Sequence, residues 1–164
     1  MMMFNTTKSL LVALVFVLMC FWAFGVVRVN ASDVALTQEA QAAITPILGS
    51  LEFATKLAGA KLIVIMGHTE CGAVRGACDR AHLGLLTAAL ANLNPAVDAV
   101  QGDYKPRNSE NDKFVQAVAE KNVRLTMQKL RTRSNVLREL IDKGEVGLVG
   151  AMYNVRTGKV TFYE

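Results

Sequence analysis

Residues 61–79 read KLIVIMGHTECGAVRGACD, and this stretch decides the fold. Leu62–Met66 is a strand-length, β-branched run without polar alternation, which predicts a strand buried on both faces. We expect Gly67 to end that strand, and Ala73–Ala77 to form a helix. A buried strand that runs into a helix is typical of an open α/β sheet, and such sheets bind ligands at the carboxyl ends of their strands.

His68 and Cys71 fall between this strand and this helix. Imidazole and thiolate are common zinc ligands, and two intervening residues let both reach one ion. The alternative is structural, because buried cysteines are common in protein cores. Cys78 and His82 extend the pair to four donors, but a helix beginning near Cys71 would place Cys78 about 10 Å farther along its axis. That distance is too long for one zinc site or a disulfide, so we expect Cys78 to be a packed thiol and His82 a surface residue.

The longer phrase GSLEFATKLAGAKLIVIMGHTECGAVRGACD, residues 49–79, resembles the β-class carbonic anhydrases. The resemblance implies that His68 and Cys71 are two of three protein ligands to a Zn(2+) ion. It implies that Gly72 supplies a loop amide near the substrate, although its role in a tight turn is an alternative. The implied reaction is the reversible hydration of carbon dioxide to bicarbonate, and the implied α/β fold is a mostly parallel sheet flanked by helices with a C-terminal antiparallel edge strand.

The third zinc ligand of that family is a cysteine in a Cys-x-Asp-x-Arg motif on an earlier strand, and this sequence contains no such motif. Residues 36–46, LTQEAQAAITP, resemble the start of the catalytic domain in exported bacterial members. Residues 47–54, ILGSLEFA, resemble a segment that follows the motif, so an internal block is absent where Pro46 meets Ile47. We therefore expect a remnant of the fold with impaired activity. The alternative is a catalytically inactive relative that acts as an interaction or assembly module.

The missing block also removes the strand that would lie beside residues 62–66. An uncovered apolar edge invites pairing with another chain, and the family forms dimers, so we expect a homo-oligomer.

Residues 1–31 have the pattern of a signal peptide: Lys8, an uncharged apolar run over Leu10–Val27, and small residues before Ser32. The run is nearly long enough to span a membrane, so an uncleaved N-terminal membrane anchor is the alternative. Either pattern predicts export, to the periplasm or as a secreted protein. Residues 32–164 then form a single domain.

The charge gives no case for nucleic-acid binding. The net charge is +4, and Lys8 and Arg28 contribute two of those charges. Basic residues recur over 121–138 without aromatic residues between them, which is typical of a solvated helix face. The glycines of residues 67–76 match no phosphate-loop pattern.

The remaining pattern predicts mostly helices. A short helix stops before Pro46, and another spans Ser50–Ala58 with Leu51, Ala54 and either Leu57 or Ala58 inward. Further helices span 83–92, begin at Asn94, span 112–131, and run from a Ser134 cap to Gly144. Strands are expected over 146–155 and 160–163. The inward residues predicted for the last two helices are Phe114, Val115, Val118, Leu125, Met127, Leu137, Leu140 and Ile141.

Overall fold

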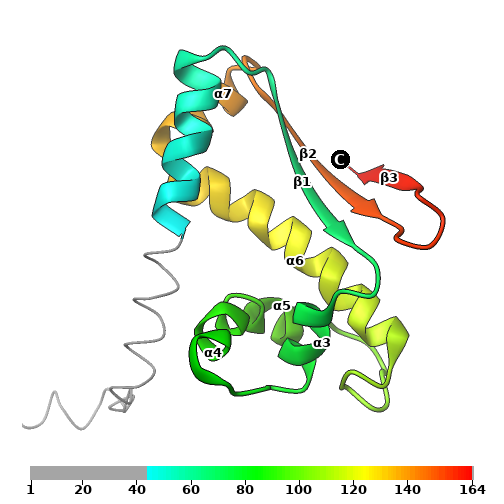
Figure 1. Cartoon of the computed structure of the whole chain (residues 1–164). Coiled ribbons are helices and arrows are strands. Elements are labelled where there is room, and N and C mark those ends of the chain that lie inside the picture. Colours follow the sequence, from blue (N-terminus) through cyan, green and yellow to red (C-terminus); the bar gives the residue numbers. More distant parts are fainter. Residues whose placement is uncertain (1–43, 164) are drawn as a thin grey trace, which may run out of the picture. The chain divides into compact units, whose positions relative to one another are not determined.

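The structure is a computed structural model, and it describes residues 44–163. The predicted leader or membrane anchor over residues 1–31 and the helix predicted to begin near Thr37 lie outside the described residues. Figure 1 shows a small sheet with the long helix α6 (Asp112–Arg133) lying against it. Within residues 44–163, every helix is too short or too polar to cross a membrane.

The first described helix differs from the prediction at Pro46. Residues 44–52 are helical on both sides of this proline. A proline disturbs the helical turn on its N-terminal side and leaves the following turns intact, and here the Ser50 hydroxyl donates to the Pro46 carbonyl oxygen at 2.9 Å. The predictions that a helix stops before Pro46 and that the next begins at Ser50 are therefore wrong.

This helix continues as the π-helical segment η1 (Phe53–Leu57) and ends where Gly59 adopts a φ of +81°. The glycine stop agrees with the prediction. The wider π-helical turn changes which side chains face inward: Thr55 is buried, whereas Leu57 and Ala58 are exposed. The predicted inward position of Leu57 or Ala58 is therefore wrong.

Three strands form the sheet in the order β1 (Leu62–His68), β2 (Gly147–Tyr153) and β3 (Val160–Tyr163). β1 and β2 are parallel, with Leu62 opposite Gly147, and β2 and β3 are antiparallel. This arrangement confirms the α/β class and the C-terminal antiparallel edge strand.

Gly67 lies inside β1 instead of ending it. A Cβ atom on Gly67 would lie 2.9 Å from the Val123 Cγ2 atom of α6 and 2.9 Å from the Met152 Cε atom of β2. Glycine is therefore needed because the helix packs closely on the strand, and the strand continues to His68.

The other helices are α3 (Gly72–Cys78), α4 (Gly84–Ala91), α5 (Asn94–Ala99) and α7 (Asn135–Asp142). They match the predicted segments. Pro95 lies in the first turn of α5. The side chains of Asn111 and Ser134 accept hydrogen bonds from the first turns of α6 and α7, at 3.1 and 3.0 Å.

Two hydrophobic clusters meet along α6. One joins α6 to α3, α4 and α5, and the other joins it to α7 and β1. The inward residues predicted for α6 and α7 are buried, except Leu125 and Met127, which are partly buried.

One face of β1 is open to solvent. Ile63 is buried against the second cluster, but Leu62 is 56% exposed and Met66 is 52% exposed. Alternate strand residues point to opposite faces, so α6 covers one set only. Phe162 of β3 is 62% exposed and shares the open face, because it pairs with Ala151, which in turn pairs with Met66. The prediction that β1 is buried on both faces is wrong for the described residues.

We predict that Leu137→Ala destabilises the fold by about 2–5 kcal/mol, because this fully buried leucine would leave a cavity in the second cluster. Leu85→Ala is the matched control: this side chain is 82% exposed, and its loss should change stability by less than about 0.5 kcal/mol. Urea unfolding followed by circular dichroism measures both. Equal effects of the two substitutions would contradict the assignment of the core.

Candidate metal centre

The structure places His68 and Cys71 at the two ends of one tight turn. His68 is the last residue of β1, and Cys71 is the N-cap of α3. This is the predicted strand-loop-helix arrangement, with both side chains at the carboxyl end of the strand. The His68 ring is exposed, and Cys71 is a free, partly buried thiol.

The hydrogen bonding of His68 determines which nitrogen is available to a metal. The Nδ1 atom lies 2.9 Å from the Thr69 carbonyl oxygen. A carbonyl oxygen only accepts, so Nδ1 is the donor of this hydrogen bond, and Nε2 is the nitrogen that the neutral imidazole offers to a metal. A histidine that donates one ring N–H to a backbone carbonyl has the usual orientation of a zinc-bound imidazole.

The turn between the two donors is tied to the end of β2. The Thr69 N–H donates to the Tyr153 carbonyl oxygen at 2.9 Å, and the Val155 N–H donates to the Thr69 Oγ1 atom at 3.1 Å. Glu70 has a φ of +59°, which is uncommon for a residue other than glycine, and its carboxylate pairs with Arg156. These contacts hold the two residues that separate His68 from Cys71.

A second ion pair holds α3 against the start of α6. Arg75 donates to the Asp112 carboxylate at 2.6 Å and to the Ser109 carbonyl oxygen at 2.5 Å. A cavity of about 220 Å³ lies between the two ion pairs, lined in part by Thr69, Glu70, Arg75 and Arg156. Sequence reasoning missed these charged residues, because nothing in the motif indicates that Arg156 returns to the turn.

Cys78 and His82 are separated from the pair. Cys78 is buried in the first cluster, where desolvation raises the pKa of its thiol, and the nearby Asp79 carboxylate raises it further. His82 is exposed beyond the end of α3. These positions agree with the predicted packed thiol and surface histidine. Both described cysteines are free thiols.

Gly72 is the first residue of α3, and a Cβ atom there would meet nothing within 4 Å. The backbone φ of Gly72 is not positive. Neither packing nor backbone conformation therefore requires glycine, which contradicts the tight-turn alternative. The open space lies directly beside Cys71.

The donor pair fits zinc in kind but not in number. An imidazole nitrogen and a thiol are both zinc ligands, and a catalytic zinc site needs three protein ligands with a fourth position left open. Among residues 44–163, no group of three or more His, Cys, Asp or Glu side chains is arranged to hold a metal. The described chain thus offers two donors from one turn.

Comparison with known proteins places this turn in a family context. Residues 25–160 match a family model described as carbonic anhydrase. A carbonic anhydrase 2 of Mycobacterium tuberculosis is 28% identical over 113 residues, which cover 69% of this chain and 54% of that protein. The chain spans about half the length of the curated relatives it matches.

The fold is also similar to solved structures of β-carbonic anhydrases. The β-carbonic anhydrase CafA of Aspergillus fumigatus has a TM-score of 0.57 and 27% identity, covering 69% of this chain and 53% of that chain. A tetrameric β-carbonic anhydrase of Sordaria macrospora has a TM-score of 0.57 and 22% identity, covering 71% of this chain and 59% of that chain.

We predict that iodoacetamide alkylates Cys71 faster than Cys78 at pH 8. Only the thiolate reacts, and the raised pKa of the buried Cys78 thiol leaves it protonated at a pH where an ordinary cysteine begins to ionise. The difference should narrow as pH rises and vanish in urea. Peptide mapping by mass spectrometry gives the rate at each site, and faster labelling of Cys78 in the folded chain would contradict its burial.

Proposed function

Because this chain belongs to the carbonic anhydrase family, we propose that it is a β-class-like zinc protein whose described residues supply two of the three protein ligands of a metal site. The observation that carries the proposal is that one turn holds two zinc-binding groups. His68 is hydrogen-bonded through Nδ1, which leaves Nε2 for a metal, and Cys71 has a free thiol. The substrate we propose is carbon dioxide, in exchange with bicarbonate.

A zinc ion held there would supply a nucleophile at neutral pH, because zinc lowers the pKa of water to about 7. The chain's own part is to present His68 Nε2 and to release the Cys71 proton, since a thiol binds zinc as the thiolate. Thr69 and the Glu70–Arg156 pair keep the turn closed on β2. Two donors hold zinc weakly, and we propose that hydration by this chain is impaired for that reason.

The open sheet face supports a second candidate function, an interaction or assembly module without catalysis. Leu62, Met66 and Phe162 are apolar and more than half exposed on the face that α6 does not cover. Soluble proteins rarely expose such a surface without a partner. We propose a second copy of this chain as that partner, and the tetrameric assembly of the Sordaria macrospora relative supports this choice.

We predict that the chain binds zinc at least about 10–100-fold more weakly than a three-ligand carbonic anhydrase. Loss of a residue that only orients a ligand already costs that much, and here a whole ligand is missing. Competition with a chelating dye measures zinc affinity, and stopped-flow hydration of carbon dioxide measures activity. His68→Ala and Cys71→Ala should each abolish zinc binding.

The matched control is His82→Ala, which removes an exposed imidazole from outside the turn and should leave zinc affinity unchanged. Zinc that stays bound when both His68 and Cys71 are replaced would refute the metal centre. Hydration at the rate of a complete relative would refute the impairment. A chain that binds zinc weakly, lacks hydration activity and still associates would favour the assembly module.

We predict that the purified chain is larger than a monomer by light scattering coupled to gel filtration. The double substitution Met66→Glu and Phe162→Glu should release monomers, because association would bury two charges in an apolar interface. Leu85→Glu changes an apolar side chain on α4 that is even more exposed, and it should leave the assembly intact. If the unsubstituted chain is a monomer, the proposal that a second copy of the chain covers this face is wrong.

A further inference from the structure

His68 lies on the open face of the sheet. Alternate residues of a strand point to opposite faces, so His68 continues the row of Leu62 and Met66 along β1. All three side chains are exposed, whereas Ile63, which points the other way, is buried. The histidine of the metal turn and the exposed apolar side chains of β1 are therefore on the same side of the sheet.

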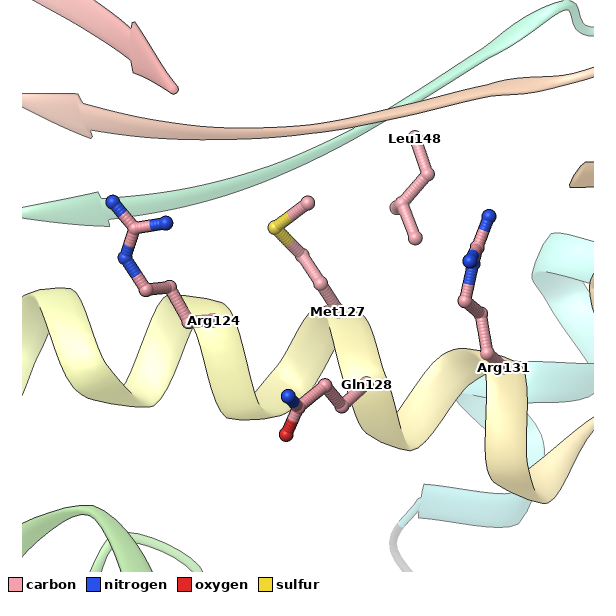
Figure 2. A pocket seen from close by; sticks show the side chains of 5 residues that line it. All are labelled: Arg124, Met127, Gln128, Arg131 and Leu148. Carbon is pink, nitrogen blue, oxygen red and sulfur yellow. The ribbon is translucent and has the colours of Figure 1, made fainter. Parts of the chain in front are cut away.

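The opposite face of the sheet is covered by α6. Figure 2 shows Arg124, Met127 and Arg131 projecting from α6 toward the strands, with Leu148 of β2 extending toward the helix. Leu148 pairs with the buried Ile63, so this is the face away from His68. A second chain that covers the exposed residues of β1 therefore approaches from the face that carries His68.

The start of α3 leaves room for a second chain beside the turn. A Cβ atom on Gly72 would meet nothing within 4 Å, and Ala73 after it is exposed. Both residues directly follow Cys71, whose thiol is free. Part of another chain can therefore lie next to the second donor as well as the first.

The turn has half the donors that a structural zinc site needs. Among residues 44–163, no third His, Cys, Asp or Glu side chain joins the imidazole and the thiol in a metal-binding group. Structural zinc sites are four-coordinate, and two cysteines with two histidines are a common ligand set. Two copies of this turn supply that set. A symmetric dimer brings them together when its two-fold axis passes beside the turn, because each residue near the axis then lies next to its own copy.

We propose that two copies of this chain share one zinc ion, which His68 and Cys71 of each copy hold beside the ends of the two β1 strands. The inference rests on the metal centre of the proposed function and adds the partner that completes it. A site with four protein ligands has no open position for water, so it links the two copies and does not hydrate carbon dioxide. The weak affinity predicted above is then that of the single chain, and zinc binds more tightly as the chain concentration rises.

The first test is the effect of zinc on association of the purified full-length chain. Elemental analysis of the dimer isolated by gel filtration should find one zinc ion per two chains. Zinc at about 100 times its dissociation constant from the dimer should tighten association about 100-fold relative to the same protein in EDTA, because the ion binds the dimer far better than the single chain. Sedimentation at a series of chain concentrations measures this change.

Two substitutions are matched for this test. His68→Ala should remove the effect of zinc on association. His82→Ala removes an exposed imidazole outside the turn and should retain the full effect.

A second test reports on Cys71 directly. Two thiolates on one zinc ion lie within about 4.6 Å of each other, twice the Zn–S bond length. Removal of zinc with EDTA followed by oxidation with diamide should therefore join the two copies through a disulfide between their Cys71 residues, which peptide mapping identifies. Cys71→Ser should lose this cross-link, and Cys78→Ser should keep it, because Cys78 is buried in the core.

The outcomes separate this inference from the metal centre on which it rests. One zinc ion per chain, or an association that EDTA leaves unchanged, would overturn the shared site and leave the metal centre of the single chain standing. A chain that binds no zinc would overturn both. One zinc ion per two chains without a cross-link at Cys71 would overturn the ligand set.

Discussion

The structure depends on how closely α6 approaches the sheet. Two glycines make that approach possible, Gly67 on β1 and Gly150 on β2. A Cβ atom on Gly150 would lie 2.9 Å from the Met127 Sδ atom and 2.8 Å from the Tyr163 ring. Side chains from α6, β2 and β3 therefore fill the space that these two residues leave, and the single long helix joins both hydrophobic clusters to the strands.

Local signals in the sequence predicted most of the elements, because they act through neighbouring residues. Ser134 caps α7, Pro95 begins α5, and Gly59 ends the first helix. The errors concern tertiary packing. The apolar run over 62–66 indicates a strand but not which of its faces a helix covers, and Gly67 looks like a strand end unless the closeness of Val123 is known.

In the candidate site, too, the residues with local signals were predictable and those that depend on tertiary contacts were not. His68 and Cys71 were predictable because their spacing and the strand-to-helix pattern are local, and the family resemblance agrees with the comparisons. Glu70 and Arg156 were not, because these two residues are 86 positions apart in the sequence and meet only in the folded chain. The sequence also lacks the Cys-x-Asp-x-Arg motif, and the fold brings no substitute from residues 44–163.

The pairing of β1 with β2 has a consequence for synthesis on the ribosome. Leu62 pairs with Gly147, and the helices between these strands form from nearby residues. The first strand therefore emerges long before its neighbour exists, with its apolar side chains unprotected while translation continues. Closing a loop over such a span is slow, so this pairing is a late step in folding, and until α6 covers it the first strand is a segment prone to aggregation.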